Sequence, residues 1–201
     1  MIAVIDYGAG NLFSVCNALE YLGLNHQLTN NPEDLRAADG LILPGVGAFP
    51  AGMQMLRESG LVEVICEESK KKPLLGICLG MQMLLEESDE VAPCKGLGLI
   101  RGSVHRIPSQ RVIIPHMGWN ELTVLQADCP LLQGLEHPLY TYFVHSYQAF
   151  CDDANIVAYA DYDGRIPALI TDGGYVFGAQ FHPEKSGEQG LQMLRNFGGM
   201  L

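Results

Sequence analysis

Short apolar runs alternate with segments of helical periodicity over residues 1–90 of the chain. Strands are expected at Ile2–Asp6, 25–29, Gly40–Gly45 and 73–77. Short runs that are bounded by turn residues are typical of buried strands. Because strands and helices alternate in this half, we expect a parallel sheet that helices cover on both faces.

Glycine, proline and asparagine mark where the helices between these strands begin and end. Asn11 is a potential N-cap, and Gly23 is a stop signal, for the first helix. Proline is favoured in the first helical turn, so Asn31-Pro32 predicts the start of a short second helix. The predicted helices cover 11–22, a short segment from 31 onward, 49–72 with a break at Gly60, and 79–87.

The second half of the chain has a different pattern. From Cys94 to about Tyr162 the sequence consists of short strand candidates and turns. A hairpin is expected over 168–184, with its turn at Asp172–Gly174, and the last helix is expected over 186–197. We find no linker, repeat or low-complexity segment, so the sequence predicts one mixed α/β domain over residues 1–201.

Composition and charge disfavour several classes of protein. Hydrophobic residues make up 48% of the 201 residues, which indicates a folded core rather than disorder. The formal net charge of −11 disfavours nucleic acids and anionic membranes as partners. The N-terminal segment has no basic region or cleavage site, and no apolar run is long enough for a membrane span, so we expect neither a signal peptide nor a transmembrane helix.

The cysteines predict a reduced, cytoplasmic protein. They are spread along the chain without a CxxC pair, so we expect free thiols rather than disulfides. Cysteines and histidines do not cluster at the spacing of a zinc site, and we expect neither a metal nor a cofactor. The six cysteines are Cys16, Cys66, Cys78, Cys94, Cys129 and Cys151.

Cys78 lies in the segment GICLG, where a predicted strand meets a predicted helix. A nucleophile on such a turn is held in a sparsely populated backbone conformation and projects above the sheet. Gly76 and Gly80 are the small neighbours that the close approach of strand and helix requires. The helix N-terminus favours the thiolate, and the Leu79 amide points to where an oxyanion would form. The alternative is a buried structural cysteine, which is common for this residue type.

His182 is the candidate base for this thiol, and Glu184 is the candidate residue that orients it. Pro183 disfavours the helical conformation for His182, so we expect extended backbone there. Residues i and i+2 of an extended segment face the same side, which brings the imidazole and the carboxylate together. A carboxylate beside an imidazole fixes its tautomer and stabilises the imidazolium. The alternative is an ordinary surface pair.

A second glycine turn follows the third predicted strand, in the segment LILPGVGAF. Backbone amides in a Pro-Gly-Val-Gly turn can form an anion-binding nest. Gly45 and Gly47 permit conformations that other residues disfavour, so the Gly45–Val46 peptide has access to more than one orientation. The alternative is a plain loop in which the glycines only allow a tight bend.

Three segments together resemble the class I glutamine amidotransferases: PGVGAF at 44–49, GICLGMQ at 76–82 and FHPEKS at 181–186. The resemblance spans nearly the whole chain. It implies a flavodoxin-like α/β domain with an inserted β portion, in which helices lie on both faces of a mixed sheet. It also implies that a cysteine attacks the side-chain amide of glutamine and expels ammonia, after which water hydrolyses the thioester.

Further segments resemble one branch of that family, the glutaminase subunits of imidazole glycerol phosphate synthases. They are IDYGAGNLFSV at 5–15, PHMGWN at 115–120 and YFVHSY at 142–147, together with PGVGAF in place of a Pro-Gly-Gly turn. This resemblance implies a role in histidine biosynthesis. It also implies a heterodimer with a (β/α)8 cyclase, which uses the ammonia to make imidazole glycerol phosphate and an aminoimidazole carboxamide ribotide.

The resemblance assigns roles to individual residues. The implied catalytic triad is Cys78, His182 and Glu184, and the implied oxyanion hole consists of the Leu79 amide with those of Val46 and Gly47. The implied glutamine-binding residues are Gln82, Glu90, His145, Ser146 and Tyr147. The implied contacts with the cyclase are Asn11, Met117, Trp119 and Lys185.

Alternatives remain open at this point. His145 could be a strand histidine that only packs, and Trp119 could be a core residue. The whole chain could be a free-standing hydrolase with the same triad, such as a peptidase or a γ-glutamyl hydrolase. It could also be a catalytically inactive subunit that only binds its partner. An electrophilic glutamine analogue that labels Cys78 would exclude the inactive subunit.

Overall fold

Strands in the computed structural model, which describes residues 1–108 and 111–201, form two sheets. Those of the first half are β1 (Ile2–Ile5), β2 (His26–Thr29), β3 (Gly40–Gly45), β4 (Leu74–Cys78), β5 (Glu87–Ser88) and β6 (Cys94–Lys95). Those of the second half are β7 (Ser103–Arg106), β8 (His116–Val124), β9 (Leu139–His145), β10 (Tyr147–Phe150), β11 (Ile156–Asp161), β12 (Arg165–Thr171) and β13 (Val176–Ala179).

Helices occupy most of the intervals between the early strands. They are α1 (Leu12–Tyr21), α2 (Pro32–Ala37), α3 (Phe49–Glu58), α4 (Val62–Glu68), α5 (Leu79–Met83) and α6 (Gly187–Gly198). Three short 3-10 helices complete the set: η1 (Pro130–Leu132), η2 (Asp153–Asn155) and η3 (Pro183–Lys185). Within the described residues, no helix has both the length and the apolar character needed to cross a membrane.

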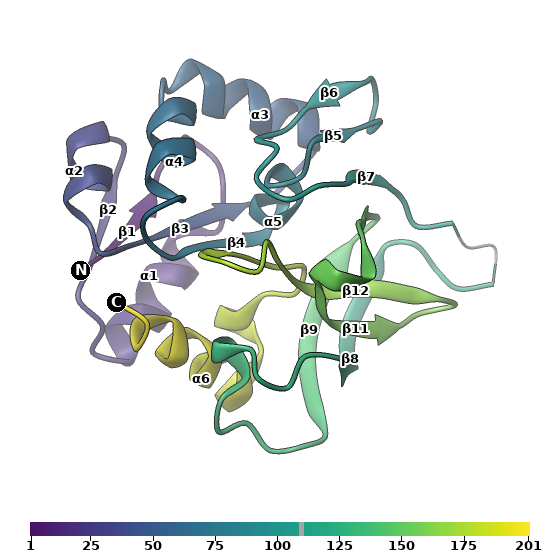
Figure 1. Ribbon diagram of the computed structural model, residues 1–201. Helices are drawn as coiled ribbons and strands as arrows, with labels where there is room; N and C mark the ends of the chain where they lie inside the picture. The colour runs from purple at the N-terminus through teal and green to yellow at the C-terminus, as the bar shows by residue number, and fades with distance from the viewer. Residues whose placement is uncertain (109–110) are drawn as a thin grey trace.

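The larger sheet has nine strands in the order β2-β1-β3-β4-β13-β12-β11-β8-β9. Pairings from β2 to β13 are parallel, whereas β12, β11, β8 and β9 add antiparallel strands. The smaller sheet has the order β10-β7-β5-β6 and lies beside α3 and α5 (Figure 1). The mixed sheet expected from the sequence is therefore confirmed.

Alternate residues of the central strands contribute to two separate hydrophobic clusters. Ile2 and Val4 of β1 belong to the cluster that α1 and α6 complete on one face of the sheet. Ala3 and Ile5 belong to the cluster on the opposite face, which α2, α3, α4 and α5 complete. Because the side chains of a strand alternate between its two sides, this arrangement buries both faces of the sheet, as Figure 1 shows.

Most predicted boundaries agree with the structure within a few residues, including the break between α3 and α4. The helix expected over 79–87 is wrong in length, because α5 ends at Met83. The chain turns there because Glu86 enters the smaller sheet: its amide donates to the Gly102 carbonyl at 3.0 Å, and its carbonyl accepts from Gly96 at 2.9 Å. Backbone pairing with distant residues thus overrides the helical pattern.

The caps of the first two helices differ. The helix that the sequence predicts to start at Asn31-Pro32 is α2, and Asn31 caps it, since its side-chain oxygen accepts from the Glu33 amide at 3.1 Å. Asn11 precedes α1 but makes no capping bond. Its side-chain amide instead lies 3.5 Å from Glu184 Oε1, at the other end of the chain. The expected hairpin between β12 and β13 is present, and its turn is closed by the Asp172 carboxylate.

Candidate active site

Cys78 is the last residue of β4 and directly precedes α5. Its backbone angles are φ 55° and ψ −110°, in a region that residues with a Cβ rarely occupy. No linker separates the strand from the helix, so the chain must reverse at this one residue. The strained turn that the sequence predicts is therefore present at Cys78.

The glycines on either side of Cys78 are required by close backbone contacts. A Cβ on Gly80 would lie 1.8 Å from the Leu43 carbonyl oxygen of the adjacent strand β3. A Cβ on Gly76 would lie 2.8 Å from backbone atoms of Gly80. Real side chains do not tolerate such distances, so both positions hold α5 against the sheet only when they are glycine.

His182 and Glu184 form a buried pair just after β13. The His182 Nδ1 atom lies 2.8 Å from Glu184 Oε1, and the two side chains are 3% and 0% exposed. β13 lies beside β4 in parallel register, so the segment that follows it reaches the end of the sheet where Cys78 turns. The His182 amide donates to the Tyr142 carbonyl at 3.0 Å and fixes this segment to β9.

The backbone between the pair differs from the sequence-based argument. His182 is extended, with φ −100° and ψ 99°, as Pro183 predicts. Glu184, however, lies in η3 rather than in extended backbone. The carboxylate therefore reaches the imidazole through a tight turn, which the Ser186 hydroxyl supports by donating to the His182 carbonyl at 2.6 Å.

The electrostatics of the pair favour an imidazolium. Burial lowers the pKa of His182, but hydrogen bonds with Cys78 and Glu184 and the charges of these two groups outweigh it and raise the pKa to about 9. Because Nδ1 faces the carboxylate, the other ring nitrogen is the one available to Cys78. A thiol, an imidazole and a carboxylate in this sequence of contacts can perform nucleophilic acyl transfer.

One pocket of about 290 Å³ brings together most of the predicted site residues. It is lined by Val46, Gly47, Cys78, Leu79, Gln82, Glu90, Val144, His145, Ser146, Tyr147 and His182. All of the residues proposed for the oxyanion hole and for glutamine binding are in this set. Glu184 lies behind His182, away from the pocket lining.

The Pro-Gly-Val-Gly turn forms the side of the pocket next to α5. Gly47 has φ +96°, in the left-handed region that favours glycine. Gly45 has no such backbone angle, and its small size is needed for another reason, because a Cβ there would lie 2.6 Å from the Gly80 amide nitrogen. Packing therefore requires glycine at position 45, whereas Gly47 carries the turn conformation. The expected freedom of the Gly45–Val46 peptide stays a prediction.

Glu90 connects this turn to the pocket. Its Oε2 atom accepts a hydrogen bond from the Phe49 amide at 2.7 Å, at the start of α3. An anionic side chain beside the first amides of a helix is stabilised by them. Glu90 thereby holds the loop after β3 and presents a carboxylate to the pocket.

The residues predicted to contact a partner divide into two environments. Met117 and Trp119 on β8 are 61% and 57% exposed, so the alternative of a core tryptophan is wrong. Lys185 is also exposed, on η3. Asn11 is only partly exposed and contacts the Glu184 carboxylate, so it lies between the site and the surface.

Three polar residues next to the site were not predicted. Gln180 is fully buried and lies 4.0 Å from the Cys78 sulfur through its side-chain nitrogen. His116 is buried and hydrogen-bonded to His145. The hydroxyl of Tyr7 is buried without a partner among the described residues, and burial and the nearby Cys78 charge raise the pKa of Tyr7. Gln180 could have been noticed because it precedes His182 by two positions, whereas nothing in the sequence indicates that His116 faces inward.

No group of three or more His, Cys, Asp or Glu side chains suited to a metal ion occurs within residues 1–108 and 111–201. The pocket itself is lined by the side chains and backbone described above. The chemistry available to them is that of a nucleophilic thiol with an acid–base partner.

Comparison with known sequences gives a match over nearly the entire chain. The profile of the family "Glutamine amidotransferase class-I" matches residues 3–199. The chain is 50% identical over 202 residues to "Imidazole glycerol phosphate synthase subunit HisH" of Bacillus cereus (strain G9842), covering 100% of this chain and 95% of that protein. It is 47% identical to the subunit of the same name from Bacillus anthracis, with the same coverage.

Comparison with solved structures shows the same fold at low sequence identity. A "glutamine amidotransferase" superposes with a TM-score of 0.76 and 21% identity, covering 98% of this chain and 97% of the other. "PurLQS from Thermotoga maritima" superposes with a TM-score of 0.75 and 23% identity, covering 98% and 96% of the two chains.

Proposed function

The chain belongs to the class I glutamine amidotransferases, and from that membership we propose that it is the glutaminase subunit of an imidazole glycerol phosphate synthase, acting in histidine biosynthesis. The observation that carries this proposal is the pocket in which Cys78 and His182 meet, with Glu184 behind the imidazole. Identity of 50% over the full length to a relative of that name supports the specific synthase. We place the reaction in the cytoplasm.

The proposed reaction is acyl transfer to sulfur. The Cys78 thiolate attacks the side-chain amide carbon of glutamine and forms a C–S bond, and negative charge develops on the amide oxygen. Amides of Leu79 and of the Val46–Gly47 turn stabilise that oxygen. His182 gives a proton to the leaving nitrogen, and ammonia departs as the C–N bond breaks. His182 then takes a proton from water, whose oxygen attacks the thioester and releases glutamate and the thiolate.

The pocket lining supports glutamine as the substrate. The Glu90 carboxylate and the side chain of Gln82 both line the pocket, where they can bind the α-ammonium group of the substrate. Residues 145–147 also line the pocket, next to Gln82, and are proposed to bind the α-carboxylate through backbone N–H groups. These contacts would hold the side-chain amide of glutamine against Cys78.

The ammonia is proposed to pass to a (β/α)8 cyclase subunit. Exposed Met117 and Trp119, together with Lys185, supply an apolar and basic surface near the triad. An ammonia donor must keep its product from water, so a closed passage between the two subunits is required. The proposed surface favours this function over a free-standing hydrolase, which has no need of exposed methionine and tryptophan side chains.

Replacement of Cys78 tests the proposal in the complex with the cyclase. Cys78→Ala and Cys78→Ser should lower glutamine-dependent synthesis by at least roughly a thousandfold, since the nucleophile is lost. Synthesis from added ammonium salts should remain, because the cyclase reaction does not use Cys78. Cys66→Ser is the matched control, since Cys66 lies on α4 outside the pocket, and it should behave as the unmodified protein. Glutamine-dependent synthesis that survives in Cys78→Ala would contradict the assigned nucleophile.

The coupling to a partner has its own test. The isolated chain should hydrolyse glutamine slowly, and the rate should rise when the cyclase and its acceptor substrate are added. Equal rates with and without them would favour the free-standing hydrolase. If glutamine is hydrolysed neither with nor without the cyclase, and an electrophilic glutamine analogue does not label Cys78, an inactive binding subunit is favoured.

A further inference from the structure

The carbonyl of Tyr147 is the point where two hydrogen-bond networks meet. β9 ends at His145 in the large sheet and β10 begins at Tyr147 in the small one, so the pocket wall is the corner between the sheets. The Tyr147 carbonyl accepts from Gln82 Nε2 at 3.0 Å and from His145 Nδ1 at 2.8 Å. Both bonds fix the same corner, one from α5 and one from β9.

The first network runs from this carbonyl to the nucleophile. Gln82 Nε2 also donates to Gln180 Oε1 at 2.9 Å, so both hydrogens of the Gln82 amide are engaged. The Gln82 oxygen is therefore the polar atom that this side chain can turn toward a substrate. Since Oε1 of Gln180 accepts from Gln82, its Nε2 must face the Cys78 sulfur, 4.0 Å away. Gln180 thus contacts a pocket residue and the nucleophile at once.

The second network runs from the same carbonyl to β8. A carbonyl can only accept, so Nδ1 of His145 carries the hydrogen and its Nε2 is free to accept. Nε2 lies 3.0 Å from Nδ1 of His116, which must donate to it. The bare Nε2 of His116 then accepts from the side-chain amide of Asn120, at 3.4 Å.

Both imidazoles have the neutral form that this direction of donation needs. Burial lowers the pKa of His145 to about 3, and burial lowers that of His116 to about 4. The rings are also held by packing, because His116 stacks on Phe143 with the ring centroids 4.6 Å apart and on Tyr162 with the centroids 4.0 Å apart. Each ring N–H of the two histidines therefore has a single defined acceptor.

We propose that Gln180 is a positioning residue that holds Gln82 in its substrate-binding orientation and donates a hydrogen bond to the Cys78 sulfur. The His116–His145 pair fixes the opposite side of the Tyr147 carbonyl and ties it to β8. Because β8 also carries Met117 and Trp119, the glutamine pocket and the proposed docking strand share one hydrogen-bond network. This inference rests on the function proposed above and deepens it.

Two replacements of Gln180 separate its two contacts, measured in the complex with the cyclase. Gln180→Met removes both contacts, so we expect the KM for glutamine to rise about tenfold and alkylation of Cys78 by iodoacetamide to slow. Gln180→Glu keeps an acceptor for Gln82 but places an oxygen rather than a donor beside the sulfur. We therefore expect its KM within about twofold of the unmodified value, while alkylation slows about tenfold.

Mass spectrometry of the peptide containing Cys78 gives the alkylation rate of that residue alone. Gln54→Met on the exposed surface of α3 is the control and should change neither quantity. A merely structural role would move both quantities together in both variants. Unchanged KM and alkylation in Gln180→Met, or an equal rise of KM in both variants, would overturn the assignment.

The contact from His145 to His116 on β8 is tested with two replacements of His116. His116→Phe keeps the aromatic stack but removes the donor to His145, so the KM for glutamine should rise by roughly threefold to tenfold. His116→Asn places a side-chain amide near the position of Nδ1 and should restore most of the loss. Equal KM values for His116→Phe and the unmodified protein would show that the contact between His116 and His145 does not help to hold the glutamine pocket.

The proposed function and this inference fail in different ways. If the unmodified complex does not hydrolyse glutamine, the function is wrong, and the alkylation comparison between Gln180→Met and Gln180→Glu still reports on the sulfur contact. If the unmodified complex hydrolyses glutamine and the Gln180 variants match it in both quantities, only the positioning role is wrong.

Discussion

Two buried carboxylates in this protein, those of Glu184 and Glu68, have different sets of polar partners. Glu184 lies behind His182 in the active site, and Glu68 lies at the end of α4, on the far side of the sheet. Both side chains are nearly inaccessible, at 0% for Glu184 and 7% for Glu68, and both contact a basic group at 2.8 Å. They differ in how completely their oxygens and their partners are satisfied.

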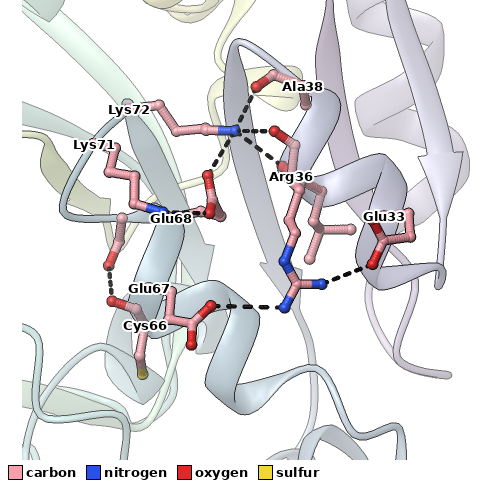
Figure 2. Close-up of polar contacts among 10 residues, drawn as sticks. Glu33, Arg36, Ala38, Cys66, Glu67, Glu68, Lys71 and Lys72 are labelled. Carbon is pink, nitrogen blue, oxygen red and sulfur yellow. Dashed lines mark hydrogen bonds and ion pairs between the residues drawn. The ribbon is translucent and has the colours of Figure 1, made fainter.

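The cluster around Glu68 is closed (Figure 2). Its two oxygens pair with Lys71 at 2.8 Å and with Lys72 at 2.9 Å, and the bond from Lys71 is the largest cause that lowers the pKa of Glu68. The Lys72 ammonium also donates to the carbonyls of Leu35 and Arg36, which α2 leaves without helical partners, and to that of Ala38 just after the helix. Every strong polar group in this cluster has its partner within the protein.

The cluster around Glu184 is left open. Its Oε1 contacts His182, but its Oε2 is buried without a partner among the described residues. His182 and Cys78 then face the pocket, where a substrate can approach. The difference indicates that a closed polar cluster holds elements together, whereas an open one keeps groups available for chemistry.

The largest expected effect comes from the open cluster. His182→Ala should lower kcat for glutamine hydrolysis by at least roughly a thousandfold, because the imidazole transfers both protons. Glu184→Ala should cost about ten to a hundred times less, since the carboxylate only orients the ring and stabilises its charge. Steady-state kinetics of the complex measures both. A larger loss for Glu184→Ala than for His182→Ala would count against these roles.

Glu68→Ala is the matched replacement in the closed cluster. It should leave kcat close to the unmodified value, because Glu68 lies outside the pocket. If Glu68→Ala reduced activity as strongly as Glu184→Ala does, without loss of folded protein, the contrast between an open and a closed cluster would be lost.

The second expected effect is on stability. Lys72→Met removes the donor to three carbonyls at the end of α2 and just after it, and one of the two cations beside Glu68, so the free energy of unfolding should fall by about 2–4 kcal/mol. Urea denaturation at neutral pH measures this. Lys70→Met is the control, because Lys70 is exposed, and it should change the free energy by less than about 0.5 kcal/mol. Similar losses in the two variants would show that the carbonyl contacts of Lys72 contribute little.

The sequence was sufficient for features that depend on neighbouring residues. The turn at Cys78, the start of α2 at Asn31-Pro32 and the hairpin at Asp172–Gly174 follow from local chemistry, and all three are present. The length of α5 and the role of Asn11 could not be predicted, because partners far along the chain decide them. The closed cluster at Lys72 could not be predicted either, because its ammonium binds carbonyls more than thirty positions earlier in the sequence.

The smallest expected effect is on the pH dependence of stability, which distinguishes His116 from the cluster around Glu68. Burial lowers the pKa of His116 from 6.5 to about 4, so below pH 6.5 the unfolded chain binds a proton that the folded protein does not bind. Stability should therefore fall as the pH falls from 6.5 toward 4.5, by up to about 1.4 kcal/mol per pH unit for this residue. His145, whose pKa burial lowers to about 3, acts in the same direction.

Glu68 and His182 contribute to folding stability in other pH ranges, so their contributions can be distinguished from that of His116. The pKa of Glu68 is lowered from 4.5, so its contribution is lost only as the pH falls through the lower folded value. The pKa of His182 is raised from 6.5 to about 9, so its contribution is complete below pH 6.5 and is lost as the pH rises toward 9. Urea denaturation between pH 6.5 and 4.5 should thus show a weaker dependence on pH in His116→Phe. Lys72→Met should keep the dependence of the unmodified protein at a lower overall stability. An unchanged slope in His116→Phe would mean that His116 is protonated in the folded protein, and its Nε2 atom could then not accept from Asn120.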